Sequence, residues 1–239
     1  ENHISELIDI PNSADCFPGV NVAGGVCYFL WEKEYHGDCN VKNVVKGAVV
    51  SEMRRSLNEY SYFVRNNTAL SIIRKTHIEK NALDTRVFSR NCFCIPTTVV
   101  GEERPYKNHI SVLTSKGVIY VHKDDISDAK DILGKYKVVI TYAMSGGNKP
   151  TSDGNYQVIS SLKVLNPNEA CSETYLVIDT FDEKEKAENL VTYLSTKFCR
   201  FLLLQALVNF QGAASLYSDF FLAVPSSRNR SGFVFLTEV

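Results

Sequence analysis

The sequence has little of what marks secreted, membrane or metal-dependent proteins. Its seven cysteines form no Cys-x-x-Cys pair and no even framework of spacings, although Cys92 and Cys94 stand only one residue apart. We therefore expect reduced thiols that fill space in the core of a cytoplasmic protein. No apolar run approaches the ~20 residues of a membrane span, so we expect no membrane partner. We also expect no signal peptide, and the start at Glu1 instead of a methionine leads us to expect a fragment of a longer protein.

Positive and negative charges are also nearly balanced. The 239 residues include 26 Lys and Arg against 27 Asp and Glu, which gives a net charge of -1. The net charge therefore indicates no polyanionic partner, although it says little about local patches. Hydrophobic residues make up 44% of the chain, a typical value for a globular protein, and the length allows one large domain or two modest ones.

Motifs for catalysis are missing as well. The chain has no GxxxxGK[ST] phosphate loop, no GxGxxG turn and no GxSxG nucleophile elbow. We therefore expect no catalytic residue in this chain. For a metal, His36 and Cys39 have a plausible spacing and Cys27 lies upstream, but a structural zinc site usually needs two close ligand pairs. We therefore expect no bound metal.

One acidic stretch leaves an alternative open. Residues 182–186 (Asp-Glu-Lys-Glu-Lys) contain the carboxylates and the lysine that a metal-dependent nuclease needs. The same residues stand at the predicted start of a helix, where the helix dipole favours acidic side chains without any catalytic role. A metal-dependent restriction endonuclease domain therefore stays as an alternative function.

What the sequence does contain, near its start, is a turn-rich stretch over residues 17–31. Pro18-Gly19 predicts a tight turn, and the pair Gly24-Gly25 leads into six consecutive apolar residues from Val26 to Trp31. Paired glycines allow a close approach of backbones, and the apolar run has the length of a strand that is buried on both faces. We predict strands in this half of the chain at residues 4–10, 22–31 and 39–50.

Farther along, helical and extended patterns alternate. Asn66 or Asn67 is predicted to cap one helix, and Asp124 or Asp125 to cap a short helix that ends near Gly134. The best-defined element is a long helix over residues 182–208, whose apolar stripe is expected to pack on a sheet. Further strands are predicted at residues 117–122, 137–142, 156–165, 174–178 and 220–224. The pattern indicates an α+β fold with mixed sheets.

Basic residues gather in the middle of the sequence. Those that fall within fewer than forty positions include Arg54, Arg55, Arg65, Arg74, Lys75, Arg86 and Arg90. Arg104 and Lys107 follow in a loop with Tyr106, and residues 145–149 form a second polar loop. Phosphate contacts and base reading in DNA need such side chains on one surface. A solvated face, or a non-catalytic protein-interaction domain, is the alternative interpretation.

Several stretches, in this order and spacing, resemble the adenine-N6 DNA methyltransferases of type II restriction–modification systems. One of them, Ser-Arg-Asn-Cys-Phe-Cys-Ile-Pro-Thr at residues 89–97, is similar to the family's S-R-x-P-F-G-x-P-T, with Cys92 and Cys94 in place of Pro and Gly. The other similar stretches are Asn12–Val20 with Gly24–Leu30, Lys135–Ile140, Glu173–Ile178 with Ala187–Leu190 and Tyr193–Leu202, and Phe220–Pro225. The tail at residues 226–231 departs from the pattern.

The resemblance implies a division of labour within a longer protein. The family's cofactor-binding glycine motif and its catalytic N-P-P-Y would lie upstream, in a missing N-terminal methyltransferase domain that uses S-adenosylmethionine. Residues 1–50 would then contain the terminal strands of that domain's sheet, and residues 51–239 a target-recognition domain that binds double-stranded DNA and needs no cofactor. On this basis the predicted DNA contacts are Arg86, Arg90, Arg104 and Lys107, with Asn148, Lys149 and Gln211 as loop candidates.

Overall fold

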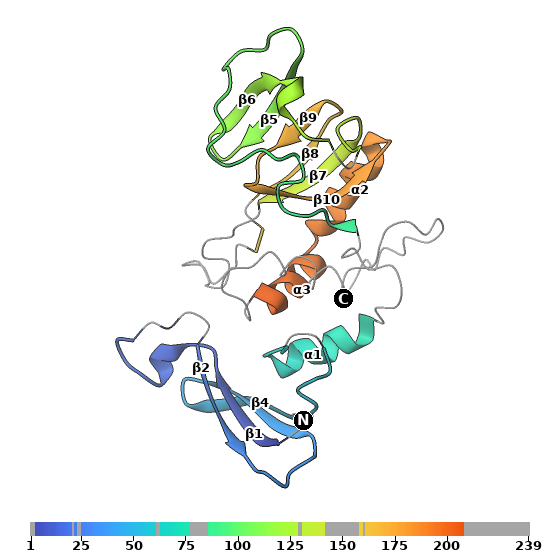
Figure 1. Ribbon diagram of the computed structural model, residues 1–239. Helices are drawn as coiled ribbons and strands as arrows, with labels where there is room; N and C mark the ends of the chain where they lie inside the picture. Colours follow the sequence, from blue (N-terminus) through green and yellow to red (C-terminus); the bar gives the residue numbers. More distant parts are fainter. Residues whose placement is uncertain are drawn as a thin grey trace. The chain divides into compact units, whose positions relative to one another are not determined.

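The chain is built from two compact units, which are described one at a time. The computed structural model describes residues 3–20, 22, 25–60, 63–76, 86–128, 131–141, 158–159 and 161–207 (Figure 1). The first unit comprises Glu1–His77, Ala143–Ser160 and Lys197–Asp219. The second unit comprises Ile78–Tyr142, Ser161–Thr196 and Phe220–Val239.

A four-stranded sheet forms the body of the first unit. Its strands lie in the order β2-β1-β3-β4, where β1 is Ile4–Ile10, β2 is Val26–Trp31, β3 is Cys39–Val45 and β4 is Ala48–Arg55. β1 pairs antiparallel with β2 and parallel with β3. β4 runs through residue 50, where the sequence places a domain boundary, and it pairs with β3 in the same sheet.

The predicted strand over residues 39–50 is in fact a hairpin of two strands. Lys46 and Gly47 both have positive φ angles, 50° and 78°, and they form the two-residue turn between β3 and β4. Turns of this kind match the twist of the strands that they join, and glycine enters them without strain. The run of valines hid the turn because it continues on both sides of it.

The apolar strand β2 was predicted correctly in position but wrongly in burial. Its residues Tyr28, Phe29, Leu30 and Trp31 are each more than half exposed. The reason is that β2 lies at the edge of the sheet, where among the described residues it pairs with β1 alone. A run of large apolar side chains therefore stands on an open sheet edge, where a buried central strand was expected.

One helix covers part of this sheet. α1 (Asn67–Ile73) begins at Asn66, whose side chain accepts hydrogen bonds from the backbone N–H groups of Thr68 and Ala69, as the predicted cap requires. α1 contacts β3 and β4 and continues into the 3-10 turn η2 (Arg74–Thr76). The small apolar core of the sheet contains Leu7, Cys39 and Val41.

The second unit contains two three-stranded sheets. One has the order β10-β7-β8, from β7 (Tyr136–Thr141), β8 (Leu162–Leu165) and β10 (Tyr175–Phe181). The other has the order β6-β5-β9, from β5 (His109–Thr114), β6 (Gly117–His122) and β9 (Glu169–Cys171). A shared core joins them, with Phe93, Val112, Val139 and Val177 almost completely buried. These sheets and the helices confirm the α+β fold class.

The predicted long helix is two helices. α2 (Lys184–Leu194) buries Ala187, Leu190 and Leu194 and contacts β7, β8 and β10, as expected of a helix packed on a sheet. α3 (Lys197–Leu207) follows after Ser195 and Thr196. The hydroxyl groups of these two residues donate to the carbonyls of Val191 and Tyr193 over 2.7 Å. Such local bonds compete with the helical ladder, which explains the break.

Other expectations had mixed outcomes. The helix predicted from Asp124 or Asp125 is only the 3-10 turn η4 (Lys123–Asp125), and His122 provides its cap. The carboxylate of Asp128 then accepts the N–H groups of Ile132 and Leu133, over 2.9 and 3.1 Å, and so closes a turn. β5 and β9 were not predicted, and the strand expected at 220–224 lies outside the described residues.

Candidate nucleic-acid interface

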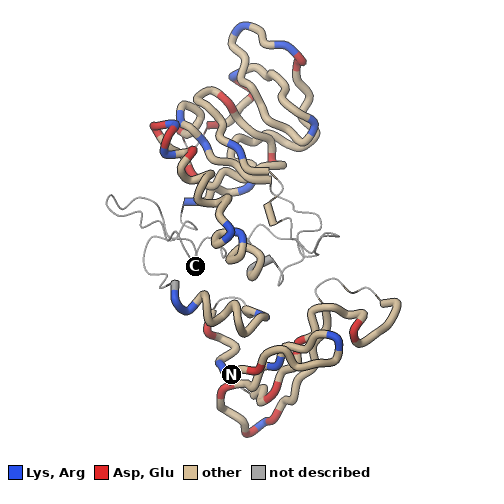
Figure 2. The backbone as a smooth tube through the Cα atoms, turned by 180° about the vertical axis from the view of Figure 1, so that it is seen from behind, with Lys and Arg blue, Asp and Glu red and all other residues tan. Residues whose placement is uncertain are grey.

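Most of the basic residues between positions 54 and 74 have partners inside the first unit. Arg55 is buried, and it donates to Asn67 and to the carbonyl of Val64. Arg65 pairs with Asp9, and Arg74 pairs with Glu59. Figure 2 shows Lys and Arg interspersed with Asp and Glu along the backbone of both units. The cluster in sequence is therefore largely a set of structural ion pairs.

Arg86, a predicted DNA contact, is also engaged within the protein. Its guanidinium forms an ion pair with Asp179 of β10 and lies 5.4 Å from the ring centre of Phe181. The side chain of Arg86 is 14% exposed. This geometry gives Arg86 a clear role in fixing the segment before residue 90 to β10. A contact between Arg86 and DNA stays a prediction.

Arg90 begins a segment that is held firmly at several points. Its guanidinium lies 3.4 Å from the carboxylate of Glu173 and is about half exposed. The same carboxylate accepts the N–H of Thr97, and the N–H of Glu173 donates to the carbonyl of Ile95 over 2.9 Å. Phe93 is fully buried in the core. The segment over residues 89–97 is therefore a fixed part of the second unit, with Arg90 on its exposed side.

The backbone of this segment is left-handed at Cys94. Cys94 stands where the family pattern has glycine, and its φ angle is +56°. Only glycine adopts this left-handed region without a steric cost. Cys94 therefore holds a backbone conformation that glycine would adopt without this cost.

Arg104 and Lys107 stand on one exposed loop, residues 101–108 (the 101–108 loop). Both side chains are exposed, and neither forms an ion pair with any residue in the described part of the chain. The loop is fixed at both ends. Glu102 and Tyr120 exchange two backbone hydrogen bonds of 2.9 Å, and the N–H of Lys123 donates to the carbonyl of Asn108 over 3.0 Å. The loop therefore presents two cations outside the described ion pairs from a defined backbone, together with the exposed Glu102 and Glu103.

An aromatic cluster supports the same loop. The ring centres of Tyr106 and His109 are 5.8 Å apart, and those of His109 and Tyr120 are 5.0 Å apart in an edge-to-face arrangement. His109 also donates from Nδ1 to the carbonyl of Tyr106. Tyr106 stands between Arg104 and Lys107 in sequence, so the aromatic cluster and the two cations belong to one surface element.

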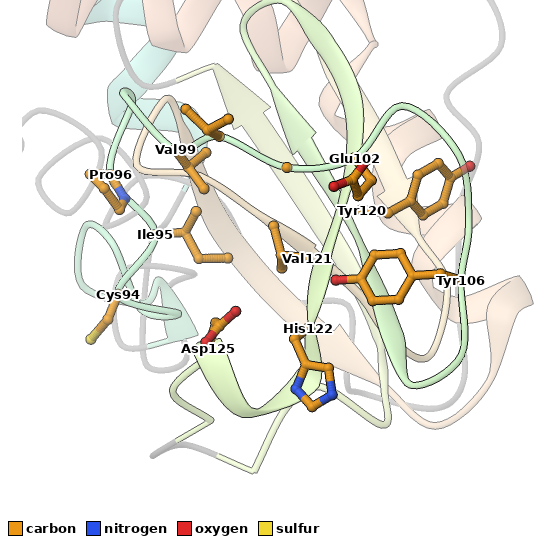
Figure 3. Close-up of a pocket in the computed structure, with 12 residues that line it drawn as sticks. Cys94, Ile95, Pro96, Val99, Glu102, Tyr106, Tyr120, Val121, His122 and Asp125 are labelled. Carbon is orange, nitrogen blue, oxygen red and sulfur yellow. The ribbon is translucent and has the colours of Figure 1, made fainter.

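Beside the 101–108 loop lies a pocket of about 260 Å³, which we call the β6 pocket. Figure 3 shows Tyr106 and Asp125 extending toward it from different sides, with Val121 between them and Ile95 and Val99 on the side of Asp125. Sequence reasoning missed this pocket. A usable signal was present, because Tyr120 and His122 occupy alternate positions of one strand and so share a face.

The perturbed ionisable groups are structural. Burial lowers the pKa of Lys137 to about 8, and its Nζ donates to the carbonyls of Leu133, Lys135 and Asn166. Burial raises the pKa of the Cys92 thiol to about 11 and that of Cys199 to about 12. Thiols of this kind stay protonated and are poor nucleophiles.

The residues of the nuclease alternative form surface ion pairs at the start of α2. Lys186 pairs with Glu183 over 2.5 Å, and Asp182, which is 87% exposed, lies 3.9 Å from Lys135. Among the described residues no group of three or more His, Cys, Asp or Glu could hold a metal ion. In the same part of the chain, none of the helices has the length and apolar character to cross a bilayer.

Of the predicted DNA contacts, the structure places two on one loop and pairs Arg90 with Glu173. Arg104 and Lys107 share the 101–108 loop, and the segment that starts with Ser89 and Arg90 continues into residues that line the β6 pocket. Arg86 points to β10 instead. The loop candidates Asn148, Lys149 and Gln211 lie outside the described residues.

Comparison with known proteins gives one informative similarity. No protein-family model matches the chain. An "Uncharacterized adenine-specific methylase" of Mycoplasma pneumoniae is 38% identical over 74 residues. The chain is related to a methylase. The aligned stretch is 30% of this chain and 17% of the relative, so the chain spans less than a fifth of the length of the protein it matches.

Proposed function

We propose that the chain is the DNA-binding target-recognition portion of a site-specific adenine-N6 DNA methyltransferase of a restriction–modification system. The observation that carries the proposal is the 101–108 loop, which presents Arg104 and Lys107 without acidic partners among the described residues. Cations in such positions can neutralise phosphates and fix the protein on a duplex. The similarity to an adenine-specific methylase supports the same assignment.

Methyl transfer itself belongs, in this proposal, to another part of the whole protein. The cofactor would be S-adenosylmethionine. The methyltransferases that this chain resembles bind it at a glycine-rich motif. After β1 the described chain enters the 3-10 turn η1 (Ser13–Asp15), where no glycine-rich turn opens an α-helix. In this proposal we assign the cofactor and the chemistry to the N-terminal methyltransferase domain. The target adenine would be rotated out of the duplex to reach that domain.

The edge strand β2 supports the presence of such a partner domain. Four consecutive large side chains of β2 are more than half exposed, and exposed apolar patches of this kind mark protein contacts. We propose that the methyltransferase domain packs against the first unit here, which places the chain inside a larger protein.

A salt titration tests the DNA-binding proposal. The chain is mixed with a fluorescently labelled duplex, and the dissociation constant is measured by anisotropy at several salt concentrations. Each phosphate contact adds roughly 1 to the slope of log K against log[salt]. Replacing Arg104 and Lys107 together by alanine should therefore lower the slope by about 2.

The matched control is Lys33→Ala, which removes an exposed cation from the first unit. It should leave the slope unchanged. An Arg104→Ala/Lys107→Ala variant with unaltered affinity and slope would remove these residues from the interface. Absence of salt-dependent binding by the unaltered chain would refute the proposed function and favour a protein-interaction domain.

A further inference from the structure

We propose that the β6 pocket binds a single unstacked nucleobase that carries an exocyclic amino group, as cytosine and adenine do. The inference rests on the proposed DNA-binding function and gives the 101–108 loop a second task, base recognition beside the phosphate contacts. Four features support the assignment: the size of the pocket, its polar groups, its position beside the 101–108 loop and the fixed conformation of its wall.

The dimensions and the floor of the pocket fit one base. Its volume is about 260 Å³, and sites for drug-sized ligands run from ~300 to 1,000 Å³. The floor is apolar, with Ile95 and Val121 buried and Val99 partly buried. A flat aromatic heterocycle can bury its faces on such a floor, whereas a sugar or a phosphate would lose its hydration there.

Beside Tyr106 and His122, the pocket is lined by two carboxylates that can accept hydrogen bonds from amino groups. The carboxylate of Asp125 extends into the pocket, and the carboxylate of Glu102 lies at its rim (Figure 3). Neither carboxylate accepts a hydrogen bond from the described residues or pairs with a described cation. Carboxylates are the acceptors that proteins use for the cytosine N4 amino group. Thymine, which offers a carbonyl and no amino group at that position, is disfavoured.

The position of Tyr106 links this pocket to the DNA backbone. Tyr106 extends its ring and hydroxyl group toward Val121 across the pocket, and Arg104 and Lys107 flank it in the loop. Stacking of a base on an aromatic side chain is a common device for holding unstacked nucleotides. The two cations would neutralise the phosphates on either side of the held nucleotide.

The pocket wall is preorganised. Tyr106, His109 and Tyr120 form a continuous chain of ring contacts, and the hydrogen bond from His109 fixes the carbonyl of Tyr106. The backbone bonds between Glu102 and Tyr120 fix the other end of the loop. Binding a base therefore requires little ordering of the protein, which improves affinity.

The test compares duplexes that differ in one unpaired nucleotide. Anisotropy is measured at one salt concentration for a fully paired duplex, for a duplex with one bulged cytosine and for a duplex with one bulged thymine. The unaltered chain should bind the cytosine bulge about 10-fold more tightly than the paired duplex. This is the gain in affinity that stacking of one base provides. The duplex with the thymine bulge should show a much smaller gain in affinity over the paired duplex.

Three variants and one control assign the effect to the pocket. Tyr106→Ala should abolish the preference for the cytosine bulge, whereas Tyr106→Phe should retain it because the ring remains. Asp125→Asn should narrow the difference between cytosine and thymine. Tyr28→Ala, which removes an exposed tyrosine from β2 in the first unit, should change nothing. Circular dichroism checks that each variant is folded.

The outcomes separate this inference from the proposed function. Salt-dependent binding of the paired duplex without any cytosine preference, or with a preference that Tyr106→Ala leaves intact, would overturn the base pocket and leave the proposed function standing. Absence of binding to every duplex would overturn both. Deoxycytidine monophosphate alone serves as a competitor. If it binds in a Tyr106-dependent way while the bulged duplex gains nothing, the assignment to a base within DNA is overturned.

Discussion

The guanidinium of Arg65 donates to the carboxylate of Asp9 from both Nε and Nη2, over 3.0 and 2.5 Å, although 56 residues separate the two in sequence. Asp9 is 2% exposed. Asn43 connects this pair to the start of α1, because its Nδ2 lies 3.4 Å from Asp9 and its Oδ1 accepts the N–H of Asn67 over 3.0 Å. A buried polar network thus joins β1, β3 and the helix.

Removing the carboxylate should destabilise the first unit strongly. Asp9→Ala leaves a buried guanidinium without its compensating charge, and such changes cost about 3–5 kcal/mol. Trp31, the single tryptophan of the chain, lies in β2 and reports on the first unit in a urea titration followed by fluorescence. Glu34→Gln, at an exposed position, is the control. A loss below about 1 kcal/mol would show that the network contributes little.

Lys137 should make the stability of the second unit depend on pH. Its pKa is lowered to about 8 by burial, while the unfolded chain keeps the ordinary value of 10.5. Between these two pH values the unfolded state binds more protons, so this lysine adds stability as the pH rises. The buried thiols of Cys92, Cys171 and Cys199 act in the opposite direction, because burial raises their pKa.

The comparison of the unaltered chain with Lys137→Met isolates the lysine. We expect the variant to be less stable by about 1–3 kcal/mol, because three carbonyls lose their donor. The difference in unfolding free energy should grow as the pH rises from about 8 toward 10. Circular dichroism in urea at a series of pH values measures both quantities. A difference that shrinks over this range would contradict the lowered pKa.

Cys94→Gly should stabilise the second unit. The left-handed conformation costs a non-glycine residue about 1–2 kcal/mol, and glycine removes this cost. Glycine also lowers the free energy of unfolding by about 0.5–1 kcal/mol, because it makes the unfolded chain more flexible. The expected net gain is therefore about 0.5–1 kcal/mol in the free energy of unfolding. The matched control is Cys16→Gly, since Cys16 is also exposed but has a φ angle of -105°. Glycine at that position should be neutral or destabilising.

The open edge of β2 should make the isolated chain associate with itself. An exposed strand edge with large apolar side chains is a template for pairing with another chain. Leu30→Lys places a charge on this edge and should shift the chain toward a monomer in sedimentation-velocity runs. Val118→Lys, at an equally exposed position of β6, should have no such effect, because Glu102 already pairs with the neighbouring Tyr120. Equal behaviour of both variants would place the contact elsewhere.

Elements with strong local signals could be predicted from the sequence. The cap at Asn66, the strand at residues 117–122 and the acidic start of α2 each depend on neighbouring residues, and each was found. The exposure of β2 could not be predicted, because burial depends on which strands take the centre of the sheet. The turn at Lys46-Gly47 was obscured by valines on both sides.

The candidate site was predictable only in part. Arg104 and Lys107 could be assigned to a loop from the sequence, but the internal partners of Arg86 and Arg65 come from strands far away in sequence. Ion pairing at such distances has no local signature. The β6 pocket arises because residues 94–101 and 120–125 meet, and that meeting depends on the tertiary fold.

The route of the chain through the two units restricts how this protein can be divided. Each unit is assembled from three separate stretches, and the backbone passes from one unit to the other between Thr196 and Lys197, directly after α2. A shortened gene that ended there would deprive the first unit of α3 while leaving its sheet intact. Neither unit can therefore be separated whole from the other by a single cut of the chain.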